Sequence, residues 1–192
     1  MKVHVVHAHP VETSFNRSLF NVVVETLRAG GHQVDPLNLY EEKFEALLSR
    51  DERIHYEEVP QNLTPAVTPY VDRLLGCDAI VIVHPVWNYG YPAILKGYFD
   101  RIFLPGVSFR LENGGVVPNL GNIKRAAFVT TYGGDRFRTM IMGDPPRRIA
   151  KRWGWVTFGV RPTYMALYDM NNNRAPQLKA YLEKVRGKFA RW

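Results

Sequence analysis

The chain has 192 residues, of which 46% are hydrophobic and 22% charged, and its formal net charge is +7. This length and balance are typical of one soluble globular domain with a full core. No apolar run approaches the roughly 20 residues that a membrane span needs, which argues against membrane insertion. Strand character begins at Lys2, so we expect no signal peptide and a cytoplasmic location. The single cysteine, Cys77, cannot form an intrachain disulfide, which fits a reducing compartment.

The positive charge, with a sequence pI of about 9.6, is dispersed along the chain. The densest basic cluster is Arg147-Arg148 with Lys151-Arg152, and its spacing is helical. We interpret this cluster as a solvated cationic helix face rather than a nucleic-acid-binding surface. No nucleic-acid partner is therefore expected.

The start of the chain alternates strand and helix patterns. Residues 2–8 form a β-branched apolar run, and helical spacing follows over residues 15–29 with Ser14 as a plausible N-cap. Gly30-Gly31 closes that helix, and residues 33–39 form a second strand. This order of strand, helix and strand predicts a parallel sheet.

The rest of the chain continues the alternation after an irregular, charged excursion over residues 40–65, in which we expect one short helix. The later predicted elements are, in chain order, a helix at 66–75, a strand at 78–83, a helix at 91–103, a loop at 104–122, a strand at 124–131, a helix at 136–153, a strand at 156–168 and a helix at 176–189. Five strands alternating with helices predict a single α/β domain over residues 1–192, with strand order 2-1-3-4-5 and helices on both faces.

Three loops follow the carboxyl ends of the first, third and fourth predicted strands, where ligands bind in open α/β sheets. The first loop, residues 9–16, ends at a helix N-terminus. Its Thr13 and Ser14 hydroxyls and free backbone amides could hold a phosphate. It is neither a GxGxxG nor a Walker loop. The alternative is an ordinary capped helix, with His9 as a core histidine.

The second and third loops offer backbone amides and flat surfaces. From Pro85 to Gly90 the chain presents backbone N–H groups and the aromatic faces of Trp87 and Tyr89, which suit a planar, acceptor-rich heterocycle such as an isoalloxazine. After the fourth strand, Gly133-Gly134 permits close approach of the backbone to a ring edge or a phosphate. Each loop alone could be an ordinary connection, but together they predict one crevice.

Together these segments resemble the flavodoxin-like NAD(P)H:quinone oxidoreductases, the DT-diaphorase family. The resemblance covers nearly the whole chain. It is strongest in Ala8-His9 with residues 13–16, in Gly90 with residues 92–97, Phe99 and Arg101, and in residues 131–134. It implies a tightly bound flavin, with FAD favoured and FMN as the alternative, and NAD(P)H as co-substrate. It also implies a homodimer with sites at its interface and ping-pong hydride transfer to a quinone or a related electrophile.

The resemblance also implies roles for individual residues. The phosphates would be held by His9, Thr13, Ser14, Phe15 and Asn16, and the isoalloxazine by Pro85, Val86, Trp87, Asn88, Tyr89, Thr131, Tyr132, Gly133 and Gly134. Arg174 would reach the adenosine diphosphate of FAD, and Tyr89 and Phe137 would face the substrate. Residues 135–144 lack the Tyr and His that mammalian members carry after the two glycines, so no acid–base catalyst is assigned. No metal site is expected.

Two other functional classes compete with this hypothesis. A flavin-binding ancillary subunit of a glutathione-gated potassium efflux system is the alternative, and the sequence does not separate it from an enzyme. Peripheral association with a membrane is compatible with either function. An electron-transfer flavodoxin is disfavoured, because flavodoxins are usually strongly acidic and this chain is basic.

Overall fold

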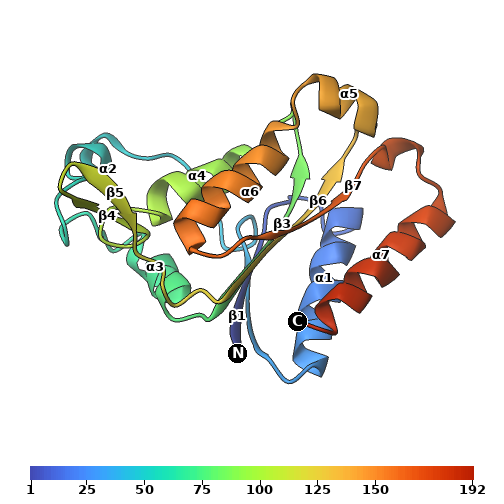
Figure 1. Cartoon of the computed structure of the whole chain (residues 1–192), viewed down its shortest axis with the longest axis horizontal. Coiled ribbons are helices and arrows are strands. Elements are labelled where there is room, and N and C mark those ends of the chain that lie inside the picture. Colours follow the sequence, from blue (N-terminus) through green and yellow to red (C-terminus); the bar gives the residue numbers. More distant parts are fainter.

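The computed structural model describes residues 1–192 and contains one five-stranded parallel sheet flanked by helices (Figure 1). Its strands are β1 (Lys2–His7), β2 (Gln33–Asn38), β3 (Ala79–Val86), β6 (Arg125–Tyr132) and β7 (Thr163–Leu167). Their order in the sheet is β2-β1-β3-β6-β7. Counting these five strands along the chain, this is the predicted order 2-1-3-4-5.

Helices cover both faces of the sheet because the central strands are apolar on both sides. On one face, α1 (Phe15–Ala29) and α7 (Ala175–Phe189) pack side by side. On the other face lie α3 (Thr68–Leu75), α4 (Ala93–Ile102) and α6 (Pro145–Phe158). Successive strand residues point to opposite faces, so β3 is buried on both sides, as is typical of parallel sheets.

Within the irregular excursion, one short helix, α2 (Arg50–Ile54), forms as predicted. It has a capping box between Ser49 and Glu52. The ion pair of Glu52 with the buried Arg101 of α4 attaches the excursion to the domain. No helix of the structure is both long and apolar enough to cross a membrane.

The prediction of a loop over residues 104–122 is wrong, because this segment contains an antiparallel hairpin. Its strands are β4 (Phe109–Glu112) and β5 (Gly115–Pro118). Asn113 and Gly114 join them with φ angles of 51° and 76°. Asn-Gly is the residue pair that a tight hairpin turn with left-handed backbone favours, so the sequence did carry the signal.

The single helix predicted over residues 136–153 is in fact two helices, α5 (Arg136–Ile141) and α6. Gly143 and Asp144 have positive φ angles of 79° and 44°, and Pro145 then begins α6. This left-handed pair ends one helix, and proline in the first turn starts the next.

The fifth strand is also shorter than predicted. α6 continues to Phe158 and ends at Gly159, whose φ is 68°, so the strand β7 begins only at Thr163. A short 3₁₀ helix, η1 (Met170–Asn172), then leads toward α7.

Candidate cofactor and substrate site

The sheet opens beside the carboxyl end of β3. β1 pairs with β3 only as far as His7 and Val83, whereas β3 continues against β6 to Val86. Pro85 lies in this stretch and has no N–H to donate, as expected where a strand becomes an edge. The last residues of β3 therefore have a free side facing the point where the chain of β1 turns away. This is the switch point at which ligands bind in such sheets.

The first loop leads into α1 with the predicted cap. Ser14 is the N-cap, and its Oγ accepts a hydrogen bond from the N–H of Arg17 at 3.1 Å. The N–H groups of Phe15 and Asn16 have no partner within the helix, because the first turn offers them no carbonyl. These amides and the positive end of the helix dipole form a site for an anion, which we call the α1 site.

Asn16 connects α1 to the end of β6. Its side chain is buried, and its Nδ2 donates a hydrogen bond to Oγ1 of Thr131 at 3.5 Å. Its Oδ1 is buried without a hydrogen-bond partner. Because buried polar atoms are nearly always paired, the natural partner of this oxygen is the buried ring of His7, whose two nitrogens also lack a partner.

His9 lies between the first and second loops. Its Nδ1 accepts a hydrogen bond from the N–H of Val11 at 3.1 Å, so Nε2 carries the proton of the neutral ring. Its ring meets that of Trp87 edge-on, with centroids 5.8 Å apart. Partial burial lowers the pKa of His9 below its ordinary value. At neutral pH His9 is therefore an uncharged hydrogen-bond donor.

The second loop is a two-residue hairpin turn. Trp87 and Gly90 exchange backbone hydrogen bonds of 3.2 and 2.8 Å. Between them, Asn88 and Tyr89 have φ angles of 48° and 57°. Left-handed backbone is costly for a tyrosine, and such strain concentrates at functional sites. The Tyr89 hydroxyl lies 3.6 Å from the position that a Cβ on Gly134 would take, so the turn brings this side chain to the third loop.

The third loop begins at Gly133 and Gly134, after β6. A Cβ on Gly133 would lie 3.1 Å from Nδ2 of Asn171, closer than an ordinary contact. The carbonyl of Gly134 accepts a hydrogen bond from the N–H of Asp169 at 2.9 Å. Glycine here therefore allows the segment after β7 to approach the loop closely.

The three loops meet around one crevice with a volume of about 240 Å³. Nine predicted cofactor residues line it: His9, Ser14, Phe15, Asn16, Pro85, Val86, Trp87, Thr131 and Gly133. Two further lining residues, Met170 and Asn171, were not predicted. They follow β7, and the carboxyl end of that last strand was the available signal for them.

The other predicted residues lie outside the lining of the crevice. Thr13, Asn88, Tyr89 and Gly134 are sequence neighbours of lining residues, whereas Tyr132, Arg174 and Phe137 are separate cases. The Tyr132 hydroxyl donates a 2.6 Å hydrogen bond to Asp144, which directs this side chain toward α6. Arg174 is exposed at the start of α7, and Phe137 is exposed on α5.

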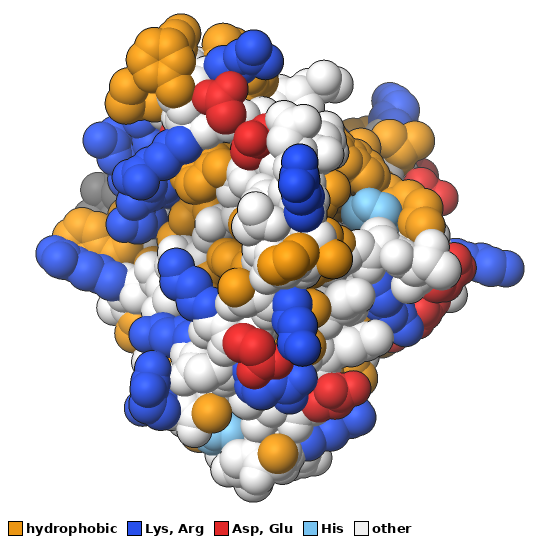
Figure 2. Space-filling model, turned by 90° about the vertical axis from the view of Figure 1, so that its right-hand side faces the viewer, with side chains coloured by type: hydrophobic (Ala, Val, Ile, Leu, Met, Phe, Trp, Pro, Cys, Tyr) orange, Lys and Arg blue, Asp and Glu red, His pale blue; other side chains and the backbone are white.

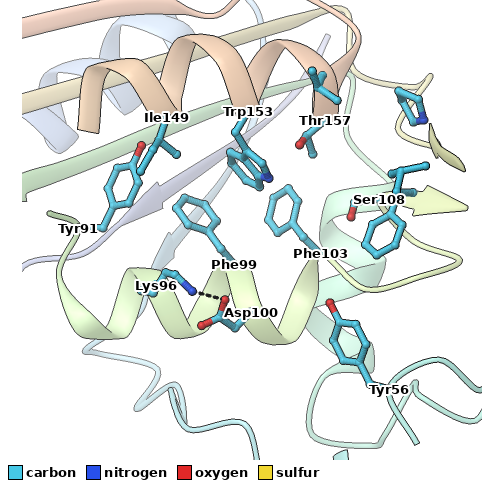
Figure 3. A pocket seen from close by; sticks show the side chains of 14 residues that line it. Tyr56, Tyr91, Lys96, Phe99, Asp100, Phe103, Ser108, Ile149, Trp153 and Thr157 are labelled. Carbon is cyan, nitrogen blue, oxygen red and sulfur yellow. Dashed lines mark hydrogen bonds and ion pairs between the residues drawn. The ribbon is translucent and has the colours of Figure 1, made fainter. Parts of the chain in front are cut away.

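The largest cavity, about 450 Å³, lies elsewhere, between α4, α6 and the β4–β5 hairpin (Figure 3). The rings of Phe99, Phe103 and Trp153 line it, and the ion pair of Lys96 with Asp100 lies beside them. We refer to it as the aromatic groove. It offers mainly aromatic and aliphatic carbon, whereas the smaller crevice combines backbone amides, hydroxyls and an aromatic wall. The polar chemistry that a cofactor needs is therefore at the crevice.

The residues around the crevice fit a flavin. The α1 site and the Ser14 hydroxyl offer donors to a phosphate. Trp87, which is 41% exposed, provides a flat wall for a ring. Backbone N–H groups at the second loop could stabilise negative charge on a ring edge, as an oxyanion hole does.

Comparisons with known proteins agree with this geometry. Residues 1–189 match the model of a protein family described as having the flavodoxin-like fold. An uncharacterized NAD(P)H oxidoreductase of Haemophilus influenzae is 34% identical over 132 residues, which cover 66% of this chain and 62% of that protein. An FMN-dependent NADH:quinone oxidoreductase of Clostridium perfringens is 29% identical over 113 residues, which cover 58% and 57%. The chain thus matches less than two thirds of the length of these relatives.

Among solved structures, an NAD(P)H:quinone oxidoreductase of Methanothermobacter marburgensis has the same architecture. The two structures superpose with a TM-score of 0.87 at 25% sequence identity. The superposition covers 99% of this chain and 98% of the other. The likeness therefore includes all elements that surround the crevice.

Proposed function

The chain belongs to the family with the flavodoxin-like fold, and we propose that it is a flavin-dependent oxidoreductase that transfers a hydride from NAD(P)H to a quinone or a related electrophile. The observation that carries this proposal is the meeting of three loops at the free edge of β3, where a helix N-terminus, an aromatic wall and a glycine loop line one crevice. The bound flavin would supply the redox chemistry, and the protein would hold and orient it.

The residues of the crevice divide into two groups by chemistry. Ser14 and the amides of Phe15 and Asn16 would bind the phosphate, with His9 donating from Nε2. Trp87 and Gly133 would lie against the ring system, one as a wall and the other as a place of close approach. No residue of the crevice is assigned as an acid or a base.

We favour FMN over the FAD expected from the sequence. Arg174, the residue on which the FAD expectation depended, does not line the crevice. The Clostridium perfringens relative is named as FMN-dependent. The mass of the flavin released on denaturation distinguishes the two cofactors directly.

We also expect ping-pong kinetics. The crevice is smaller than the roughly 300–1,000 Å³ of typical ligand pockets, so a ring bound there would keep one face open. Tyr89, whose hydroxyl lies near Gly134, and the exposed Phe137 of α5 remain our candidate contacts for the reactants. One open face would have to accept the nicotinamide and the acceptor in turn.

A homodimer is part of the proposal. α5 exposes Phe137, Met140 and Ile141, each about two thirds accessible, and the aromatic groove is a second uncovered apolar surface. Large exposed apolar patches are typical of interaction surfaces. Analytical ultracentrifugation tests this directly. A fully active monomer would contradict the proposed homodimer.

The experiment that tests the proposed function combines flavin content with steady-state kinetics. We expect the purified protein to be yellow, to release FMN, and to oxidise NADPH or NADH with menadione as acceptor. Double-reciprocal plots at several menadione concentrations should give parallel lines. A colourless protein that binds neither FMN nor FAD would contradict the proposal, and intersecting lines would contradict the ping-pong order.

A further inference from the structure

The break between α5 and α6 creates a second hollow, which we call the α5–α6 cleft. It has a volume of about 380 Å³. Five cationic side chains line it: Arg136, Arg147, Arg148, Lys151 and Arg152. Four of them come from α6, where i,i+4 spacing gathers their side chains on one side of the helix. The cluster that the sequence suggested was a solvated helix face is therefore part of a concave site.

The cations of the cleft have no partner of opposite charge. No salt bridge involves any of the five, although the neighbouring Arg138 pairs with Asp135 at 3.3 Å. The single carboxylate of the cleft, Asp144, accepts hydrogen bonds from Tyr132 at 2.6 Å and Tyr168 at 3.0 Å. Like charges that line one hollow repel one another, and a bound anion would relieve that repulsion.

The cleft adjoins the flavin crevice without sharing a lining residue with it. Tyr132, which bonds Asp144 of the cleft, directly precedes Gly133 of the crevice. The α1 site belongs to the sheet face covered by α1 and α7, whereas α6 covers the opposite face. A flavin whose phosphate lies at the α1 site would leave the cleft to a second anionic molecule.

We infer that the α5–α6 cleft binds the phosphate groups of the nicotinamide co-substrate and selects NADPH over NADH. This inference rests on the proposed function and names the preferred co-substrate of that reaction. Five cations and one carboxylate give the cleft a formal charge of +4. NADPH differs from NADH by a 2′-phosphate, a group with a charge of about −1.5 to −2 at pH 7.

Guanidinium groups suit this role because they bind phosphate oxygens through two parallel hydrogen bonds. Arg148 and Arg152 are both exposed, and neither side chain has a hydrogen bond or ion pair that the fold needs. Figure 2 shows a dense group of Lys and Arg side chains beside exposed hydrophobic ones near the top of the molecule, the end at which Figure 1 places α5.

The test compares NADPH and NADH in the flavin-loaded protein and in the double variant Arg148→Gln/Arg152→Gln. We expect the wild type to favour NADPH in kcat/KM by at least about tenfold, because each lost charge-assisted hydrogen bond costs about that much. The double variant should lose most of this ratio, through KM for NADPH. The matched control Lys179→Gln/Lys184→Gln removes two exposed charges from α7, on the other face, and should keep the ratio.

A binding measurement separates failure of this inference from failure of the proposed function. Calorimetry with 2′,5′-ADP and with 5′-AMP should show tighter binding of 2′,5′-ADP to the wild type and a loss of that difference in the cleft variant. If both dinucleotides are oxidised with equal kcat/KM in all three proteins, the inference is wrong and the proposed function stands. If neither dinucleotide is oxidised, the proposed function is wrong, and the calorimetry alone decides whether the cleft binds a 2′-phosphate.

Discussion

The α1 site and the α5–α6 cleft are both suited to bind phosphate, but they use different chemical groups. The α1 site uses backbone amides, the Ser14 hydroxyl and a neutral His9. The α5–α6 cleft uses five charged side chains. Directional donors at a helix end act at short range, whereas clustered charges act over several ångströms and are screened by salt. The first design suits a resident cofactor, and the second suits a co-substrate that must arrive and leave.

Acid should destabilise the end of β3 that borders the crevice. His84 is fully buried beside Pro85 of the crevice, and its Nδ1 donates to the Pro85 carbonyl at 2.8 Å. Burial lowers the pKa of His84 to about 4 from an ordinary 6.5. Stability from the neutral ring is therefore complete above pH 6.5 and is lost as pH falls toward 4. The contribution lost by pH 4 is ~3 kcal/mol.

Urea unfolding of wild type and His84→Leu at several pH values measures this contribution. The variant is less stable at pH 7, but its free energy of unfolding should fall less steeply between pH 6.5 and 4. Parallel pH profiles for the two proteins would show that His84 does not limit acid stability.

Filling the glycine loop should damage the crevice and spare the cleft. In Gly133→Val, the new side chain meets Asn171 and the space where the ring would lie, an overpacking that costs about 1–3 kcal/mol. We expect flavin affinity, measured by quenching of flavin fluorescence, to fall by this amount. Gly121→Val is the matched control, because nothing lies within 4 Å of a Cβ there. Full flavin affinity in a folded Gly133→Val protein would place the ring elsewhere.

Removing the N-cap of α1 should have a smaller effect on thermal stability. Comparing flavin-free with flavin-loaded protein separates the loss of the cap from the loss of a contact to the flavin. Ser14→Ala deletes the acceptor of the Arg17 N–H, which costs about 1 kcal/mol of stability. Thermal unfolding of flavin-free protein reports this cap. A further loss that occurs only in the flavin-loaded protein reports a hydrogen bond from the hydroxyl to the phosphate. Equal losses of thermal stability in the flavin-free and flavin-loaded proteins would show that Ser14 makes no hydrogen bond to the phosphate.

Salt should produce the smallest change and the clearest contrast between the two regions. The screening length falls from about 10 Å at 0.1 M to about 3 Å at 1 M salt. We expect KM for NADPH to rise severalfold over this range, while the dissociation constant of FMN changes little. A KM for NADPH as insensitive to salt as flavin binding would contradict a cleft built on charge.

Much of the fold can be predicted from local sequence patterns, and the errors in that prediction have local causes. The helix over residues 15–29 is predicted at its observed bounds because cap, periodicity and closing glycines agree. The hairpin turn at Asn113-Gly114 was overlooked although its signal is strong. The break at Gly143 and Asp144 was missed although its signals are local, because a glycine ends α5 and Pro145-Pro146 begins α6.

The site was predictable where it depends on strand ends and not where it depends on distant contacts. The three loops follow from the order of the strands, so most lining residues were found. Asn171 approaches the crevice closely because Gly133 has no side chain in its way, and no local sequence pattern indicates this contact. Tyr132 was predicted to hold the ring, but its bond to Asp144 depends on where α6 begins. The cleft itself exists only because α5 and α6 are separate helices.

A crystal structure of the protein grown with FMN would show directly whether the crevice at the free edge of β3 holds the flavin. We expect the phosphate at the N–H groups of Phe15 and Asn16, with the ring between Trp87 and Gly133. We also expect an α5–α6 cleft free of flavin. Flavin density in the aromatic groove or in the cleft, with an empty crevice, would show that the flavin binds elsewhere.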